Sequence, residues 1–203
     1  SQAIRRLCSP KAKVSSHYFI KKNGSILQLV PDLYEAWHAG KSSWKNYKSL
    51  NKTSIGIEIQ NSGFESFSFK QINSLKRLLK NLIKIYKIDR KNVLGHSDIA
   101  PNRKKDPGEK FPWKDLSKNN LAYWHNISEK KIKKFRLKKL FLNEENNFFK
   151  NLLKIGYNKT KVSNSNYEKK IIIKAFQRRY RQSLINGVAD QECLLISKNL
   201  LKY

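Results

Sequence analysis

The chain has 203 residues, 39% of them hydrophobic and 11% aromatic, which is too rich in core-forming side chains for a disordered protein. A membrane helix needs about 20 consecutive apolar residues, and the longest apolar runs, such as 171–173, are far shorter. The excess of 43 Lys and Arg over 15 Asp and Glu gives a net charge of +28 and predicts attraction to polyanions. Because the lysines are scattered, compositional drift is the simpler explanation of the charge.

The first half of the chain predicts short strands. Residues 15–30 contain two apolar runs around Asn23-Gly24, which is a strong hairpin signal. Residues 31–53 show no clear period and predict a structured loop. The β-branched run 54–59 predicts a buried strand, and its single charge, Glu58, needs a partner because a buried carboxylate is costly.

One long helix and a rigid loop follow. Apolar residues between 69 and 86 recur on one helical face. Residues 93–96 predict another short strand, and residues 98–113 form a loop rich in Pro and Gly. Strands combined with a long helix predict an α/β fold with a mixed central sheet flanked by helices.

The character of the chain changes after about residue 126. We expect a charged linker over 127–143, and then three short helices over 144–203, the last capped by Asp190. Residues 1–126 would form the larger domain. Cys8 and Cys193 lie far apart, without metal-like or redox-like neighbours, so we expect packing residues and no disulfide.

His96 and Asp106 are the first candidates for chemistry. Ten positions separate them, and Pro101 and Pro107 restrict the loop between them. An imidazole and a carboxylate held in this way could provide two ligands of a zinc ion, which typically takes three protein ligands and a water at a catalytic site. The spacing alone leaves a structural histidine as the commoner explanation.

Four ordered blocks then resemble one family. They are 14–18 (VSSHY), 36–40 (AWHAG), 51–58 (NKTSIGIE) and 95–113, which begins GHSDIAP and continues through RKKDPG to FPW. Together they are similar to the N-acetylmuramoyl-L-alanine amidases of the AmpD/AmiD type, and most of all to the AmiD branch. The resemblance implies the peptidoglycan-amidase fold and hydrolysis of the amide bond between N-acetylmuramic acid, or its 1,6-anhydro form, and L-alanine.

The resemblance also implies the site residues. His96 and Asp106 match two zinc ligands, Glu58 the general base, and Lys104 the lysine that stabilises the developing oxyanion. The family's first zinc ligand lies in an N-terminal strand that would precede Ser1, so we expect this strand to have been cut away and to remain as a bound peptide. His17 or His38 could replace the missing ligand, although we favour both as residues of the pocket wall. On the residues alone, Glu58 would be a salt-bridged strand residue and Lys104 a solvated lysine.

Further positions are weaker candidates for substrate binding. Trp37, His38 and Ala39 would line a cleft together with His17, because an indole offers a flat apolar face to sugar rings; ordinary loop packing is an equal alternative. Asn51 would bind substrate or cap the strand entry. The segments 175–180 and 186–190 resemble a small peptidoglycan-binding domain, for which a purely structural bundle is the alternative.

Two other functions remain open at this point. An incomplete ligand set would leave a non-catalytic peptidoglycan-recognition module. The charge of +28 suggests nucleic-acid binding, but no recognisable nucleic-acid motif is present, so we expect no specific nucleic acid among the partners. We expect a peptidoglycan or muropeptide substrate and no transmembrane segment. The resemblance implies the bacterial envelope, in particular the periplasm, with a cytoplasmic or secreted protein as the alternative.

Overall fold

A three-stranded mixed sheet organises the first part of the molecule. The computed structural model describes residues 2–63, 65–157 and 165–202. The strand order is β2 (Ile26–Gln28), β1 (Tyr18–Ile20), β5 (Ile57–Ile59), with β1 antiparallel to β2 and parallel to β5. The expected hairpin is confirmed, and the Lys21 amide donates to the Ser25 carbonyl across its turn. In this register Glu58 lies opposite Phe19.

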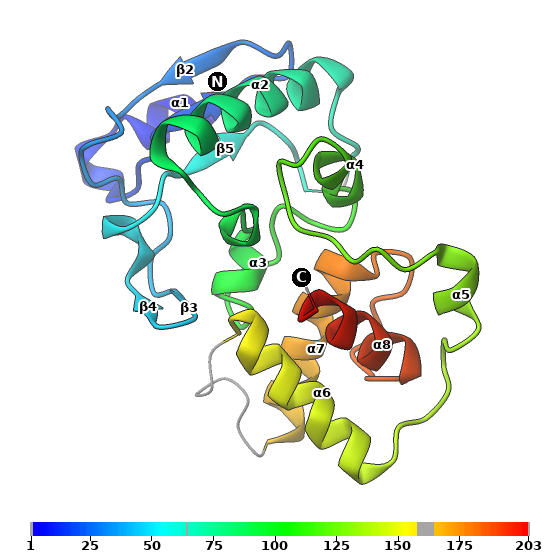
Figure 1. Cartoon of the computed structure of the whole chain (residues 1–203). Helices are drawn as coiled ribbons and strands as arrows, with labels where there is room; N and C mark the ends of the chain where they lie inside the picture. The colour runs from blue at the N-terminus through cyan, green and yellow to red at the C-terminus, as the bar shows by residue number, and fades with distance from the viewer. Residues whose placement is uncertain (1, 64, 158–164, 203) are drawn as a thin grey trace.

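Helix α2 (Phe69–Tyr86) packs along this sheet (Figure 1). The range predicted from the apolar face agrees with the observed one. Ser68 forms a capping box with Gln71, and the chain leaves the helix at Lys87 in a left-handed conformation. The buried face of α2 shares a core with α4 (Trp113–Lys118) and with the sheet, formed by Ile20, Leu75, Leu78, Leu79, Leu82, Phe111, Trp113, Leu116, Leu121 and Ala122.

Two expectations for the local structure were wrong. The predicted loop 31–53 contains a two-stranded ladder, β3 (Ser43–Trp44) with β4 (Tyr47–Lys48), and the 3₁₀ turn η2 (Leu50–Lys52); strands of two residues are too short to produce a visible period. The predicted strand 93–96 pairs with no strand among the described residues. Instead η3 (Arg90–Asn92) leads into the single helical turn α3 (His96–Ile99), because the Asp98 carboxylate accepts the Gly95 N–H and starts a helix there.

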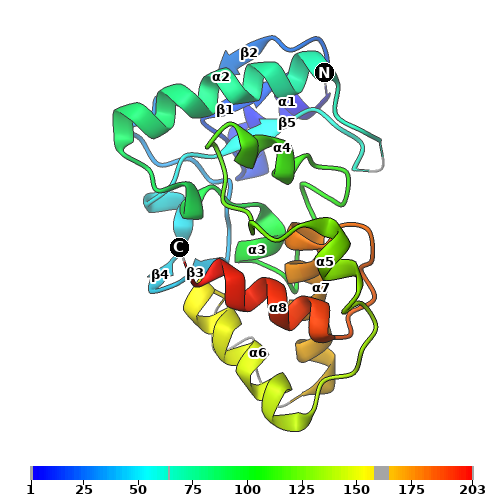
Figure 2. The same ribbon diagram turned by 45° about the vertical axis from the view of Figure 1, so that its right-hand side comes forward.

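The three expected C-terminal helices are present, as α6 (Leu142–Ile155), α7 (Asn166–Tyr180) and α8 (Gln191–Leu200), and Asp190 caps α8 by accepting the Cys193 N–H. The short helix α5 (Glu129–Lys133) lies inside the range expected to be a linker. Figures 1 and 2 show these helices packed below the sheet region, with α3 between the two parts. One core cluster joins them, since Trp44, Ile99 and Tyr123 belong to it together with Phe148 and Phe176.

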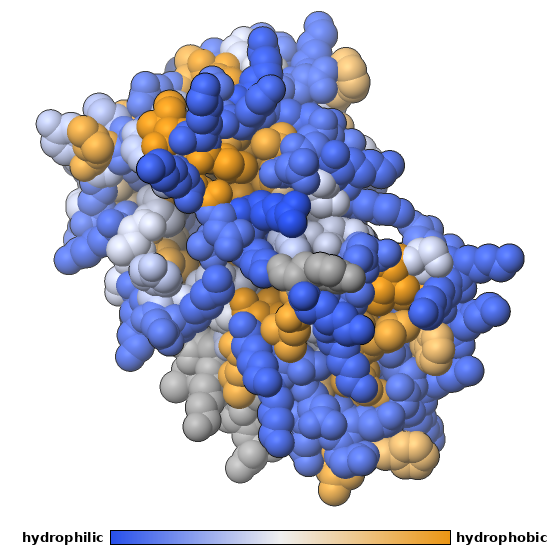
Figure 3. All heavy atoms as spheres, in the orientation of Figure 1, coloured by the Kyte–Doolittle hydropathy of each residue, from blue (hydrophilic) through white to orange (hydrophobic). Residues whose placement is uncertain are grey.

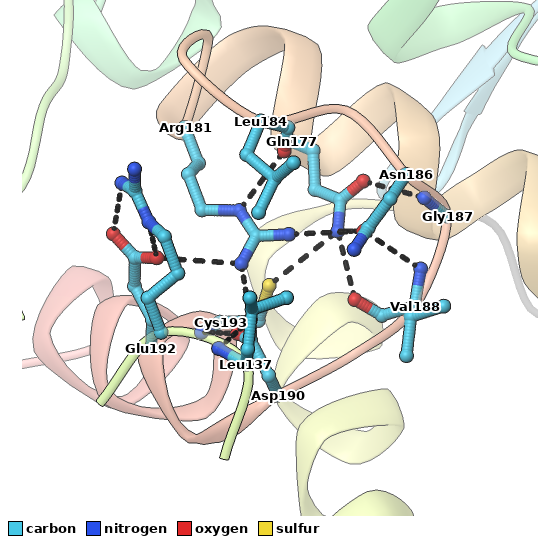
Figure 4. Close-up of polar contacts among 11 residues, drawn as sticks. Leu137, Gln177, Arg181, Leu184, Asn186, Gly187, Val188, Asp190, Glu192 and Cys193 are labelled. Atoms are coloured by element: carbon cyan, nitrogen blue, oxygen red, sulfur yellow. Dashed lines mark hydrogen bonds and ion pairs between the residues drawn. The ribbon is translucent and has the colours of Figure 1, made fainter. Parts of the chain in front are cut away.

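A buried polar network connects the turn after α7 to the start of α8 (Figure 4). Arg181 contacts the carboxylates of both Asp190 and Glu192, and Arg136 donates two hydrogen bonds to Glu192. Gln177 is fully buried and hydrogen-bonds to the 186–188 turn. The segments that resemble a peptidoglycan-binding domain therefore hold one another in place.

The surface is largely hydrophilic in the view of Figure 3, with scattered hydrophobic patches, as the high lysine content leads one to expect. Cys193 is buried, whereas Cys8 is exposed, so the expectation that both cysteines pack in a core was wrong for Cys8. Cys8 follows the short helix α1 (Gln2–Leu7), which has no buried residue. Across the described ranges no helix is both long and apolar enough to cross a bilayer.

Candidate active site

His96 and Asp106 lie side by side. The Nδ1 atom of His96 is 2.7 Å from Oδ2 of Asp106, so the ring N–H donates to the carboxylate. His96 is the first residue of α3, and the loop returns to it because the Ser97 amide donates to the Asp106 carbonyl. The other ring nitrogen of His96, Nε2, is buried and has no hydrogen-bond partner. The predicted pairing of these two residues is therefore present.

The environment of Asp106 favours the carboxylate form. Partial burial would raise its pKa, but the hydrogen bond from His96 and the charges of His96 and Lys104 outweigh that effect and lower the pKa below the ordinary value. Asp106 is thus ionised at neutral pH, which is the state that a metal ligand requires.

Glu58 lies in the middle of β5, where the charges of Asp106, His96 and Lys104 affect its pKa. Burial raises its pKa first, and the neighbouring charge of Asp106 raises it further, while His96 and Lys104 act in the opposite direction. A carboxyl group whose pKa is moved upward is a stronger base, and such a group is suited to accept a proton near neutral pH. Glu58, His96, Lys104 and Asp106 therefore form one electrostatic cluster.

A pocket of about 360 Å³ adjoins this cluster, lined by Lys13, Val14, Trp37, His38, Gly40, Asn51, Arg103 and Lys104. Three of the predicted substrate-binding residues, Trp37, His38 and Asn51, are on its wall. Glu58, His96 and Asp106 are not among its lining residues, so Lys104 is the link between the pocket and the cluster. The candidate site therefore comprises the pocket and the cluster, which meet at Lys104.

His17 is not available to a substrate or a metal. It is 1% exposed, its Nδ1 accepts the Gly56 N–H, and its Nε2 therefore carries a proton and donates to the Tyr34 carbonyl. The expectation that His17 contacts substrate or could replace a zinc ligand was wrong, because both ring nitrogens are already engaged. Its ring instead packs edge-on against His38, with 5.5 Å between the centroids.

Ala39 was also predicted wrongly as a substrate contact. Its side chain is fully buried, and its amide donates to Oδ1 of Asn51 at 2.7 Å. The same Asn51 oxygen accepts the Gly40 amide, so Asn51 shapes the turn that carries Trp37 and His38. His38 stays neutral, since burial is the main cause that lowers its pKa to about 4.

Two pocket residues had no role in the sequence interpretation. Arg103 donates to the carbonyls of Ala39 and Lys41 and so connects the two sides of the pocket. Its position directly before Lys104 was the available signal. Lys13 also lines the pocket, from a left-handed backbone conformation that no feature of the sequence indicated.

The donor set suits part of a zinc site. An imidazole nitrogen and a carboxylate are ordinary zinc ligands. Nδ1 of His96 and Oδ2 of Asp106 lie 2.7 Å apart, and an ion bound by both would replace the proton between them. Among the described residues no group of three His, Cys, Asp or Glu side chains is arranged to hold a metal. His96 and Asp106 alone would therefore fall one short of the three protein ligands that a catalytic zinc usually takes.

Comparison with known proteins identifies the family. The family model described as N-acetylmuramoyl-L-alanine amidase matches residues 1–109. The chain is 36% identical to N-acetylmuramoyl-L-alanine amidase AmiD of Escherichia coli (strain K12), over 94% of this chain and 74% of that protein. It is 41% identical to 1,6-anhydro-N-acetylmuramyl-L-alanine amidase AmpD of the same organism, over only 50% of this chain and 55% of AmpD.

Solved structures extend the likeness to the C-terminal helices. The complex of E. coli AmiD with anhydro-N-acetylmuramic acid-L-Ala-D-gamma-Glu-L-Lys superimposes with a TM-score of 0.87 at 34% identity, covering 99% of this chain and 83% of AmiD. The crystal structure of AMPDH3 from Pseudomonas aeruginosa gives a TM-score of 0.85 at 30% identity, covering 98% and 85%. The chain belongs to the N-acetylmuramoyl-L-alanine amidase family.

Proposed function

We propose that this protein hydrolyses the amide bond between N-acetylmuramic acid, including its 1,6-anhydro form, and the L-alanine of peptidoglycan or muropeptides. The observation that carries the proposal is the cluster of Glu58, His96, Lys104 and Asp106 beside an open pocket. The likeness to AmiD, whose solved complex contains an anhydromuramoyl peptide, supports the substrate class.

His96 and Asp106 would hold the zinc ion, with a third ligand from outside the described residues. When bound, zinc supplies a Lewis acid and lowers the pKa of its bound water to about 7. The ionised carboxylate of Asp106 is the protonation state that this binding needs.

Glu58 would perform the proton transfers. Its raised pKa lets it accept the proton of the attacking water and then give that proton to the L-alanine nitrogen, so that the amine leaves. Lys104, which faces both the pocket and the cluster, would stabilise the negative charge that develops on the lactyl carbonyl oxygen. Removing one such donor typically costs on the order of 10²–10³ in kcat.

The pocket would receive the sugar and the beginning of the peptide. Trp37, half exposed, offers an indole face, and neutral His38 and the Asn51 amide offer hydrogen-bonding groups. We further propose residues 1–126 as the catalytic part, 127–143 as the connection and 144–203 as the accessory part. The place of action would be the bacterial envelope, in particular the periplasm.

A digestion experiment tests the proposal. The protein, supplied with zinc, is incubated with an anhydromuramoyl peptide, and mass spectrometry follows release of the free stem peptide. We expect release by the wild type, none after chelation, and none by Glu58→Gln. Stem-peptide release that persists in a folded Glu58→Gln variant would refute the assigned base.

A non-catalytic recognition module is the second candidate, favoured by the two-ligand metal set among the described residues. It predicts binding of the muropeptide without any cleavage, even with zinc present. Calorimetry measures binding, and mass spectrometry of the same samples shows whether the ligand is cleaved; a recognition module would bind the ligand and return it intact.

A further inference from the structure

We propose that helix α7 and the turns beside it position the catalytic residues, by fixing the two flanks of the segment that carries His96 and Asp106. The proposal deepens the proposed function and rests on it, since it takes these two residues as the metal-binding pair. It assigns a positioning role to a part of the chain that was expected, from its resemblance to a small peptidoglycan-binding domain, to bind peptidoglycan.

Arg179 of α7 holds the first flank. Its guanidinium is 1% exposed, lies 3.3 Å from the Asp98 carboxylate and donates to the Val93 carbonyl at 2.9 Å. It also stacks on the Trp113 ring, with 3.4 Å between the guanidinium carbon and the ring centroid. Asp98 is the third residue of the turn that His96 begins, so Arg179 acts on His96 through that turn.

Asp98 is the connection between the flank and the helices. One of its oxygens accepts the Gly95 N–H, which starts the turn immediately before His96. The other oxygen accepts the hydroxyl of Tyr157, which follows α6. Both C-terminal contacts, from Arg179 and Tyr157, therefore converge on one buried carboxylate two residues from His96.

The second flank lies after Asp106 and is held by the same helix. Arg178 donates from Nε to the Glu109 carboxylate at 3.0 Å. Gln182, just beyond the end of α7, donates to the Phe111 carbonyl at 2.7 Å. The segment between the flanks contains one helical turn of four residues, which has little stability of its own.

These contacts are better suited to positioning the segment than to stabilising the fold. A buried ion pair is weak evidence for net stability, because desolvation offsets most of its attraction. A displacement of about 1 Å at a catalytic group, by contrast, can cost on the order of 10²-fold in rate. The side chains of 176–180 are all buried, so these residues face the protein and not a polymer outside it.

The test uses the whole chain and three variants. Arg179→Lys keeps the charge but loses the guanidinium group, whose two terminal nitrogens donate to Asp98 and to the Val93 carbonyl. The double variant Arg178→Gln, Gln182→Ala releases the second flank. Lys169→Gln is the matched control, because it breaks an ion pair of α7 with Glu145, far from both flanks.

Two measurements are made on each variant. In the metal-free protein, proton NMR observes the His96 Nδ1–H, whose downfield resonance reports the hydrogen bond to Asp106. With zinc added, kcat and KM are measured for an anhydromuramoyl peptide. We expect both flank variants to stay folded, to broaden or shift the resonance, and to lose about tenfold or more in kcat with little change in KM; the control should match the wild type.

Each outcome bears on one claim. An unchanged resonance and unchanged kcat in both folded flank variants would overturn the positioning role. If Arg179→Lys does not fold, the double variant at the more exposed flank decides. If the wild type cleaves nothing while the flank variants still shift the His96 resonance, positioning stands and the amidase assignment fails.

Discussion

The imidazole of His38 lies against the α-carbon of Gly56 so closely that a methyl group on Gly56 would come within 2.2 Å of the ring Cγ. Gly56 also donates its amide to His17 and accepts the amides of His17 and Tyr18. The glycine is therefore required for the close approach of the pocket wall to the strand. The absence of a side chain at Gly56 therefore allows the His38 ring to occupy its observed position.

Gly56→Ala is expected to push His38 out of position. Overpacking of this kind typically costs about 1–3 kcal/mol, and the pocket wall should move with the ring, which lowers kcat/KM. Chemical denaturation and muropeptide kinetics measure the two effects. In a His38→Ala background the same glycine substitution should cost much less stability, and equal costs in both backgrounds would contradict the steric explanation.

Glu58→Gln should lose activity and gain stability. Burial raises the folded-state pKa of Glu58 above its unfolded value, so the ionised carboxylate destabilises the fold increasingly as pH rises from the unfolded pKa through the folded pKa. Glutamine mimics the protonated form and escapes this penalty. Urea denaturation at pH 7 should show a more stable variant, with no such gain at pH 4.

The pH dependence of wild-type activity should follow the ionisation of Glu58. A base works only when deprotonated, so the raised pKa of Glu58 moves the acid limb of the pH–rate profile above the ordinary range of a glutamate. Glu65→Gln is the control, because exposed Glu65 pairs with Lys22 on the surface. It should leave both activity and stability nearly unchanged.

Local signals predicted the elements that depend on local interactions. The Asn23-Gly24 turn, the apolar face of 69–86 and the Asp190 cap each involve neighbouring residues, and the hairpin, α2 and α8 followed from them. Turn α3 was missed. Its local signal is a single hydrogen bond from the Gly95 N–H to the Asp98 carboxylate, and the contact of Asp98 with Arg179, 81 positions along the chain, cannot be predicted from neighbouring residues. The prediction of a strand over 93–96 was therefore wrong.

The candidate site was predictable where the motif itself carries the chemistry. The resemblance pointed to Glu58, His96, Lys104 and Asp106, and the structure gathers these four, although their roles remain predictions. His17 and Ala39 were misplaced because a motif does not reveal which of its members face inward. Both are buried, and hydrogen bonds with Gly56 and Asn51 occupy their polar groups.

His125 should make stability fall in mild acid. Burial is the main cause that lowers its pKa to about 4, whereas the unfolded value is 6.5. At a pH between the folded and unfolded pKa values, the unfolded chain binds the proton of His125 more tightly than the folded chain does. The contribution of His125 to the free energy of unfolding therefore drops by about 2 kcal/mol from pH 7 to pH 5. His125→Gln should flatten the wild-type slope in denaturation curves at the two pH values, and parallel slopes would show that His125 does not titrate in this way.

The two thiols should react very differently. Cys8 is exposed, while Cys193 is buried and its pKa is raised to about 12, chiefly by burial. Because the thiolate is the reactive form, a thiol reagent at pH 8 should label one cysteine in the folded chain and two in denaturant. Cys8→Ser should abolish the fast labelling, and fast labelling that survives would place Cys193 at the surface.

Arg181 should be the most sensitive position of the C-terminal helices. Its guanidinium is buried between Asp190 and Glu192 (Figure 4), so Arg181→Met would leave carboxylates without their shared cation, at a cost of about 3–5 kcal/mol. Glu192 keeps Arg136 and Asp190 keeps its helix cap, so the loss should stay near the lower figure. Lys169→Met removes a half-exposed pair and should cost less than about 1 kcal/mol. If chemical denaturation gives both variants the same stability, the Arg181 network does not hold these helices together.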